Sequence, residues 1–259
     1  MDTSKTNKEL IVVGDIHGHY DGFVQILRHS GLVDSGLHWV GGKKTLLQIG
    51  DVLDRGPKPL QVDTLLDDLQ IQAKLAHGEV VRLVGNHELE ILMSNFLISG
   101  LSKGEAKMVR DKLKAQVLDY DLCAAYAYNK FLFTHAGVTH KLMKIFKLQV
   151  DPLTPQNVAD LINRVFRDGI KHEFFRHPIF NISVHRKGPD KFGGIFWEDL
   201  DDLLASYTHS EICQVVGHTQ VEEITVDDEK NIIQIDVGMH RKLQYLHIVK
   251  DKCKIVTVS

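Results

Sequence analysis

Residues 45–56 read TLLQIGDVLDRG, a short apolar run followed at once by glycine and a cluster of charged side chains. The run at 45–49 has the length of a buried strand, and the residues after it are typical of a turn. The same pattern occurs four more times in the chain, at Leu10–Val13 before GDIHG (14–18), Val80–Val84 before GNHE (85–88), Phe131–Phe133 before Thr134 and HAG (135–137), and Ile212–Val216 before GHT (217–219).

Helical periodicity fills the intervals between the first three runs. One apolar stripe contains Phe23, Ile26 and Leu27 and stops before Gly31, and a second follows Pro57 and Pro59, with Leu65, Leu66 and Leu69. Strands that alternate with helices predict a layered α/β fold. Because the carboxyl ends of such strands meet at one edge of a sheet, where ligands bind, we expect the five polar clusters to converge.

Two stretches interrupt this alternation. Residues 89–119 are expected to be mostly helical after His87, with a break at residues 100–104. In the stretch 139–194, Thr154 as N-cap and Pro155 at the first position predict a helix that ends at Gly169, followed by a loop. Residues 200–259 are expected to form strands, with a hairpin turn at residues 227–230.

Length and composition fit a globular chain. The 259 residues are 43% hydrophobic and 25% charged, and we expect one domain, 1–259, in which 139–194 forms a cap. The net charge of −3 gives no general attraction to nucleic acid or to an anionic membrane. No signal peptide or membrane span is evident, and three cysteines without CxxC spacing fit a reducing compartment. We therefore expect a cytoplasmic protein; an effector exported without a cleavable signal would have the same composition.

The polar clusters contain the donors of a two-metal site. Asp15 and His17 lie two residues apart at a strand end and can face one ion, while the two oxygens of Asp51 can bridge two ions about 3.5–4 Å apart. Carboxylate, imidazole and amide donors without thiolate favour Mn, Fe or Zn, of which we expect Mn. Two such ions turn a shared water into hydroxide at neutral pH, so no protein nucleophile is needed.

In this order the clusters resemble the phosphoprotein phosphatase branch of the calcineurin-like metallophosphoesterases, whose motifs run GDxHG, GDxxDRG, GNHE, HAG and GHT. The resemblance covers residues 10–138 and 195–250. The ending GHT followed by IDVG is similar to the bacterial and Shewanella-like members. The resemblance implies a four-layer α/β/β/α sandwich of two mixed sheets, with a partly helical cap.

The resemblance also implies the site residues. Two divalent metal ions would be held by six side chains, Asp15 and His17 on the first ion, Asp51 bridging both, and Asn86, His135 and His218 on the second. His87 would be the general acid, oriented by Asp54, and Arg55 would bind the phosphate.

One position departs from the family. Related phosphatases place a second arginine shortly after a tryptophan, whereas here Trp197 is followed by Glu198 and Asp199. Either Arg176 or Arg186 supplies this contact from the cap, or phosphate binding relies on Arg55 and the metals. The loss of one bidentate arginine contact costs a few kcal/mol of affinity.

We expect a metal-dependent phosphatase of phosphorylated proteins or peptides, with phosphotyrosine favoured over phosphoserine and phosphothreonine. Three rings of the expected cap, Phe174, Phe175 and Phe180, would seat the tyrosine ring. One alternative is a diadenosine-polyphosphate hydrolase, although 139–194 has no evident nucleotide-binding pattern. The other is a catalytically weak relative that binds phosphoproteins, which the acids after Trp197 favour only faintly.

Each cluster taken singly has a purely structural explanation. Asp15 could be a helix N-cap, and His135 and His218 could be core histidines. Five such explanations holding together, in this order, are improbable. The other histidines match no ligand position; among them His240 is the nearest candidate because residues 236–238 end a strand on the same side, but a structural role is favoured for it.

Overall fold

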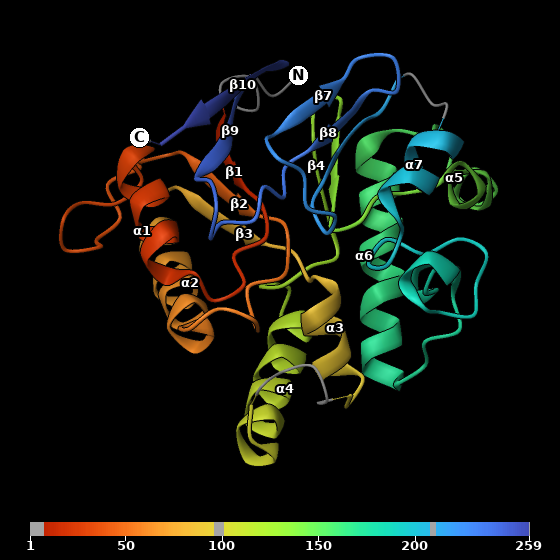
Figure 1. Ribbon diagram of the computed structural model, residues 1–259, viewed down its shortest axis with the longest axis horizontal. Helices are drawn as coiled ribbons and strands as arrows, with labels where there is room; N and C mark the ends of the chain where they lie inside the picture. Colours follow the sequence, from red (N-terminus) through yellow and green to blue (C-terminus); the bar gives the residue numbers. More distant parts are fainter. Residues whose placement is uncertain (1–7, 96–100, 208–210, 259) are drawn as a thin grey trace.

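The computed structural model describes residues 8–95, 101–207 and 211–258. Two five-stranded sheets lie face to face, and helices cover their outer sides (Figure 1). The first sheet has the order β10-β9-β1-β2-β3 and the second β4-β5-β6-β8-β7. The strands are β1 (Glu9–Val13), β2 (Thr45–Gln48), β3 (Glu79–Arg82), β4 (Ala125–Tyr128), β5 (Phe131–Thr134), β6 (Cys213–Val216), β7 (Thr225–Asp227), β8 (Ile232–Gln234), β9 (Gln244–Val249) and β10 (Lys252–Thr257).

Both sheets are mixed, which confirms the expected sandwich. In the first sheet β1, β2 and β3 run parallel, while β9 is antiparallel to β1. The last residues of the three parallel strands, Val13, Gln48 and Arg82, are in register with one another. The loops that carry GDIHG, GDVLDRG and GNHE therefore leave the sheet side by side.

Apolar side chains fill the space between the sheets. Leu10 and Val12 of β1 and Leu47 of β2 belong to the same buried cluster as Phe131 and Phe133 of β5. A second cluster joins the sheets to the helices outside them. The helices are α1 (Tyr20–His29), α2 (Pro59–Leu75), α3 (Asn86–Leu92), α4 (Lys103–Leu118), α5 (His140–Lys147), α6 (Pro155–His172) and α7 (Leu200–Ser206), with short 3-10 helices η2 (Pro178–Phe180) and η3 (Val184–Arg186).

Several predicted helix ends are confirmed. Gly31 has a φ of +67° directly after α1, and the Thr154 side chain caps α6 by accepting a hydrogen bond from the N–H of Asn157. The predicted end of α6 at Gly169 is wrong, because the helix continues to His172. Gly169 serves packing instead: a Cβ there would lie 2.7 Å from Cζ of Phe180.

Two further expectations need correction. The helix expected after His87 already begins at Asn86, so both residues lie in the first turn of α3. Residues 200–259 are not all strand, since α7 occupies Leu200–Ser206, with the Asp199 side chain capping its first turn. The hairpin turn is confirmed between β7 and β8, where the Asp227 carboxylate accepts a hydrogen bond from the N–H of Lys230.

The segment 139–194 contains α5, α6, η2 and η3. α6 packs against β4 and β5 through Val158, Leu161 and Phe166, and it forms part of the outer helical layer. The loop after α6 carries η3 toward GHT, where Arg186 contacts Thr219. The division into one domain with a cap stays a prediction. Within the described residues, no helix combines the length and apolar character needed to span a bilayer.

Candidate metal centre

The loops after the strands hold unusual backbone conformations. Five motif residues other than glycine have positive φ, namely His17, Asp51, Asp54, Arg55 and His218. Left-handed backbone at residues with side chains costs energy and clusters at functional sites. Gly85 is required by close approach, since a Cβ on it would lie 2.1 Å from Oδ1 of Asp51. The motif loops thus adopt backbone conformations of higher energy in order to position the side chains of the site.

Glu88 fixes the path of the GDVLDRG loop. Its carboxylate accepts four backbone N–H bonds, from Asp51 (2.8 Å), Val52 (3.0 Å), Leu53 (2.9 Å) and Gly85 (2.9 Å). Burial raises the pKa of Glu88, and the Asp51 charge adds to this effect, to about 7. The sequence predicted no role for Glu88, although it is the last letter of GNHE.

Four of the predicted ligand side chains converge on one point. Asn86 Oδ1 lies 3.0 Å from His135 Nε2 and 2.8 Å from His218 Nδ1, and the two imidazole nitrogens are 3.2 Å apart. Asp51 Oδ1 is 3.6 Å from His135 Nε2. The Nδ1 atom of His135 faces the carbonyl of Ile49 at 3.0 Å and therefore carries its proton, so the Nε2 atom of a neutral ring presents a lone pair.

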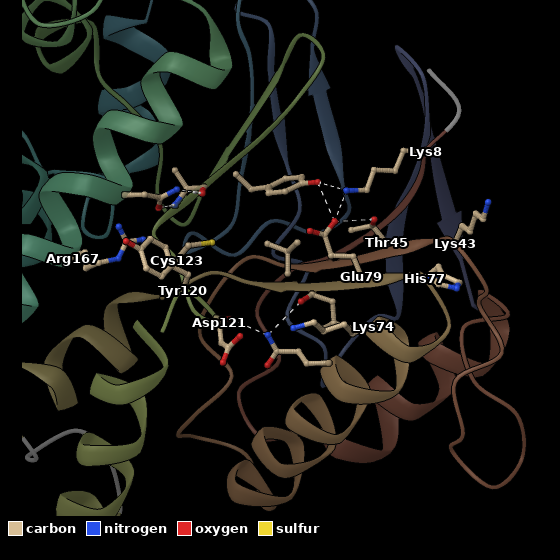
Figure 2. A pocket seen from close by; sticks show the side chains of 17 residues that line it. Lys8, Lys43, Thr45, Lys74, His77, Glu79, Tyr120, Asp121, Cys123 and Arg167 are labelled. Carbon is tan, nitrogen blue, oxygen red and sulfur yellow. Dashed lines mark hydrogen bonds and ion pairs between the residues drawn. The ribbon is translucent and has the colours of Figure 1, made fainter. Parts of the chain in front are cut away.

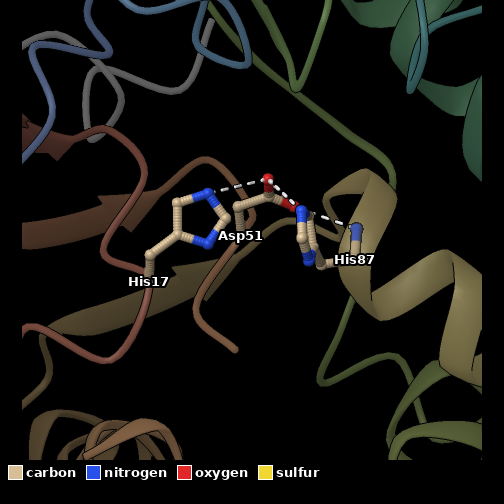
Figure 3. Close-up of side chains that lie close together, drawn as sticks. All are labelled: His17, Asp51 and His87. Carbon is tan, nitrogen blue, oxygen red and sulfur yellow. Dashed lines mark hydrogen bonds and ion pairs between the residues drawn. The ribbon is translucent and has the colours of Figure 1, made fainter. Parts of the chain in front are cut away.

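A second group forms on the other oxygen of Asp51 (Figure 3). His17 Nε2 lies 3.3 Å from Asp51 Oδ2, and its Nδ1 bonds the carbonyl of Leu53 at 3.0 Å. His87 approaches the same oxygen with Nε2 at 4.0 Å. Asp51 thus stands between two clusters of donors, as its predicted bridging position requires.

Asp15 is buried beside these groups and is held by the backbone. Both of its carboxylate oxygens lie 3.2 Å from the N–H of His218. Burial raises the pKa of Asp15, and the nearby carboxylates of Asp236 and Asp51 raise it further. Asp236, which the sequence did not single out, is itself buried, and its pKa is raised by burial to about 6. Its position at the end of the strand before Gly238 was the available signal.

The four histidines of the site divide by their pKa values. Burial lowers the pKa of His17 to about 4, and it also lowers the pKa of His135 and, most strongly, that of His218. These rings are neutral at pH 7, which is the form that binds metal. Burial acts in the same direction on His87, but the charge of Asp51 and the hydrogen bond to Asp54 outweigh it and raise the pKa of His87.

His87 is held at both ring nitrogens. Its Nδ1 lies 2.6 Å from Oδ2 of Asp54, and its Nε2 lies 3.2 Å from Nη2 of Arg55. Asp54 is buried, whereas Arg55 is exposed. The guanidinium of Arg55 therefore stands between the imidazole and solvent, where an anion can reach it.

Of the two candidate second arginines, the structure brings Arg186 to the site. Its guanidinium bonds the Thr219 hydroxyl, and its Nε lies 3.1 Å from Oδ2 of Asp199. Arg176 is exposed, and its guanidinium lies 5.8 Å from the centre of the Phe174 ring. Asp199, the second of the two acids after Trp197, thus pairs with an arginine that comes from η3.

Phe180 cannot contribute to the expected aromatic seat because its ring is buried, while the roles of the exposed Phe174 and the half-buried Phe175 stay predictions. Phe180 is buried and stacks on Phe196 with ring centres 6.0 Å apart, and Phe175 packs edge-on against Phe180. The partly exposed Trp197 lies beside the ligands instead, edge-on to His218 with ring centres 5.8 Å apart. His240 is exposed, and its ring packs against that of His19, with ring centres 5.4 Å apart, rather than against a predicted ligand.

Comparison with known proteins agrees with this geometry. The family model described as calcineurin-like phosphoesterase matches residues 9–228. The chain is a calcineurin-like phosphoesterase. It is 26% identical to Shewanella-like protein phosphatase 1 of Plasmodium berghei, in a match that covers 92% of this chain and 69% of that protein. It is 35% identical to Shewanella-like protein phosphatase 2 of Arabidopsis thaliana over 34% of this chain and 23% of that protein.

The fold is also found in solved structures. A cold-active protein-tyrosine phosphatase of a psychrophilic Shewanella species superposes with a TM-score of 0.62 at 18% identity. The superposition covers 99% of this chain and 83% of the Shewanella chain. That phosphatase thus shares the fold of this chain, and Shewanella-like protein phosphatases are among the relatives of this chain.

The donors of this phosphoesterase fit divalent metal ions. Asn86 Oδ1 and His135 Nε2 face each other at 3.0 Å, and because the Nδ1 proton of His135 bonds the Ile49 carbonyl, both atoms are acceptors, an arrangement that a shared cation satisfies. The Nδ1 proton of His17 and that of His135 each bond a backbone carbonyl, an arrangement that fixes metal-binding imidazoles. The family implies divalent metals, and these side chains are the ones that would hold them.

Proposed function

We propose that this calcineurin-like phosphoesterase is a metal-dependent phosphoprotein phosphatase that hydrolyses phosphate monoesters, with phosphotyrosine favoured over phosphoserine and phosphothreonine. The observation that carries the proposal is the division of the histidines around Asp51. His17 and His135 each bond a backbone carbonyl through Nδ1 and turn Nε2 toward Asp51, whereas His87 bonds the Asp54 carboxylate through Nδ1. A hydrolase that splits an ester with water needs both kinds of group.

Two divalent ions held by Asp15, His17, Asp51, Asn86, His135 and His218 would supply hydroxide at neutral pH and Lewis-acid contacts to the phosphate. The remaining steps belong to the protein. Arg55, exposed beside His87, is placed to bind the phosphate oxygens that face solvent. Arg186, held by Asp199 and Thr219, adds a second cation near His218.

His87 is suited to protonate the leaving oxygen. Asp54 accepts the Nδ1 proton, orients the ring and raises the pKa of His87, which favours the protonated imidazolium. Nε2 can carry the second proton once the Arg55 guanidinium, which donates to Nε2 in this structure, turns to the phosphate oxygens. As the ester bond breaks, the Nε2 proton passes to the leaving alkoxide or phenoxide, and the neutral ring remains bonded to Asp54. Water restores the proton for the next cycle.

The preference for phosphotyrosine rests on Trp197. The tryptophan is partly exposed and lies edge-on to His218, so its ring can pack against the phenyl ring of a substrate that is bound at the metals. Phosphothreonine has no ring to use this surface. We expect Trp197→Leu to lower kcat/KM for a phosphotyrosine peptide about fivefold more than for the matched phosphothreonine peptide.

The test compares hydrolysis of matched phosphotyrosine and phosphothreonine peptides, p-nitrophenyl phosphate and diadenosine tetraphosphate, all with Mn. The proposal predicts fastest turnover of the phosphotyrosine peptide. Faster cleavage of the dinucleotide would instead favour the dinucleotide hydrolase. Binding of phosphopeptides without turnover of any substrate would favour a scaffold, and either outcome would overturn the proposal.

A further inference from the structure

A cavity of about 640 Å³ lies at the other end of the strands from the metal centre (Figure 2). Thr45 lines this cavity and is the first residue of β2, whereas Asp51 follows the last residue of the same strand, Gln48. Glu79, the first residue of β3, also lines it. A ligand in this cavity therefore leaves the metal centre accessible.

The cavity lies between the edges of the two sheets. β3 is the edge strand of the first sheet and β4 the edge strand of the second. Val80 and Val81 line the cavity from β3, and Tyr126 lines it from β4. Edge strands present backbone groups to which another extended chain can add. The architecture thus offers a place for one more strand.

The backbone of Val80 faces this place. Along β3 the N–H groups of Glu79 and Leu83 bond β2 residues, to the carbonyls of Lys44 (3.1 Å) and Gln48 (2.8 Å). Because successive backbone groups of a strand point to opposite sides, the N–H and C=O of Val80 point away from β2. The C=O accepts a long bond of 3.4 Å from Nε2 of Gln70.

The edge of β4 is already covered by a side-chain amide. Asn163 Oδ1 accepts the N–H groups of Ala124 (2.9 Å) and Ala125 (3.0 Å), and Nδ2 donates to the carbonyl of Ala125 at 2.8 Å. These three bonds satisfy β4 much as a neighbouring strand would. An incoming strand is therefore expected to add to the first half of β3, at Val80, because Cys123 already bonds the carbonyl of Arg82 (3.0 Å) and the N–H of Val84 (2.8 Å) farther along this edge. At Val80 only the long bond from Gln70 must be exchanged.

The cavity carries excess positive charge, although the whole chain has a net charge of −3. Lys8, Lys43, Lys74 and Arg167 line it against two carboxylates, Glu79 and Asp121, and the Glu79 carboxylate is already paired with Lys8. The Arg167 guanidinium lies 3.5 Å from the centre of the Tyr120 ring, which fixes it at one end of the cavity, whereas Lys43 lies toward the other end (Figure 2).

We propose that this cavity is a docking site for an extended segment of a partner protein that is acidic at both ends and apolar between them. The segment adds as a strand to the edge of β3 and bonds the backbone of Val80. Its acidic ends meet Arg167 on one side and Lys43 and Lys74 on the other. Because docking leaves the metal centre open, the segment can tether a substrate to the enzyme and raise its local concentration.

The probe is a fluorescein-labelled peptide, Asp-Asp-Val-Thr-Val-Asp-Asp, with both termini blocked, and binding is followed by fluorescence anisotropy. We expect saturable binding that the double variant Lys43→Glu/Lys74→Glu weakens at least about tenfold. The control variant Lys103→Glu/Lys107→Glu, on exposed lysines of α4, should stay within about twofold of the unsubstituted protein. All three proteins should hydrolyse p-nitrophenyl phosphate equally well, so a failure of docking is separable from a failure of the phosphatase proposal.

Strand addition is tested with two N-methylated peptides, one methylated on odd amides and the other on even amides. Only one set of amides faces β3, so one peptide should lose binding about tenfold while the other retains it. No saturable binding, binding unchanged in Lys43→Glu/Lys74→Glu, or equal binding of both methylated peptides would overturn the proposal. Displacement of the peptide by equimolar inorganic phosphate would also overturn it, in favour of a simple anion site.

Discussion

The Nδ1 atom of His87 lies 2.6 Å from the Oδ2 atom of Asp54, and both side chains are buried. The pair joins the start of α3 to the loop after β2, two segments that are more than thirty residues apart in the chain. This bond gives His87 a different role from the other three histidines of the site. Each of those three has a ring nitrogen that faces the carboxylate of Asp51 or the amide oxygen of Asn86. The mechanism depends on this difference.

Replacing His87 by asparagine removes the proton donor but none of the predicted ligands. We expect the rate on an alkyl phosphate to fall about 10²–10⁴-fold, and the rate on p-nitrophenyl phosphate to fall far less, because its leaving group needs little protonation. Metal content should not change. His172→Asn, at an exposed position of α6, is the matched control. A His87→Asn enzyme with full activity on alkyl phosphates would remove His87 from the mechanism.

Asp54→Asn should change the pH profile as well as the rate. Burial alone lowers the pKa of His87, but Asp51 and Asp54 raise it above its ordinary value, so the protonated form persists to higher pH. Activity that needs this proton is present below the raised pKa and is lost as pH rises through it. Because Asp54→Asn removes one raising contribution, the alkaline limb of kcat/KM should move to lower pH. A lower rate with an unmoved limb would mean that Asp54 serves packing only.

Glu88→Gln should weaken metal binding although Glu88 is not itself a predicted ligand. The amide offers one acceptor oxygen and an NH₂ group in place of a carboxylate that accepts four backbone N–H bonds. We expect the free energy of unfolding to fall by about 3 kcal/mol. Manganese affinity, measured by calorimetry, should fall as well. Glu90→Gln, two residues farther along α3 and bonded to Asn95 rather than to the GDVLDRG loop, is the control and should keep its metal affinity.

Stability at low pH should depend on an ion-pair cluster that joins β3 to α2 and α4. Arg82 on β3 is almost fully buried and pairs with Asp63 and Asp67 of α2, and Lys112 of α4 joins both carboxylates. Burial alone would raise the pKa of Asp63, but Arg82 and Lys112 outweigh it and lower the pKa below its ordinary value. A carboxyl whose pKa is lowered on folding contributes stability above its unfolded pKa, near 4, and loses it as pH falls through the folded value.

Asp63→Asn should therefore cost about 3 kcal/mol at pH 7, since it leaves Arg82 buried with one partner fewer. The difference from the unsubstituted protein should shrink as the pH is lowered below about 4. Urea unfolding at several pH values measures both effects. Asp160→Asn, on the exposed face of α6, is the control. A constant difference at every pH would contradict the assigned charge of Asp63.

The positions of the motif loops, which depend on where the strands end, could be predicted from the sequence. A buried run before each motif was enough to place GDIHG, GDVLDRG and GNHE at one edge, because parallel strands in register end together. The sequence could not predict roles that depend on approach in space. Glu88 bonds a loop more than thirty residues away, and Arg186 rather than Arg176 reaches GHT because of the path taken by the chain after α6. Gly169 misled for a related reason, since its lack of a side chain accommodates Phe180 rather than ending a helix.

The central claim is that a pair of ions lies on either side of Asp51, and anomalous diffraction from crystals grown with manganese tests it most directly. We expect two peaks, one bounded by Asp15, His17 and Asp51 and the other by Asp51, Asn86, His135 and His218. Crystals of Asp51→Asn should lose both peaks or retain one at low occupancy. Crystals of the unsubstituted protein that show no manganese peak among these side chains, or manganese only elsewhere, would contradict a metal pair at Asp51.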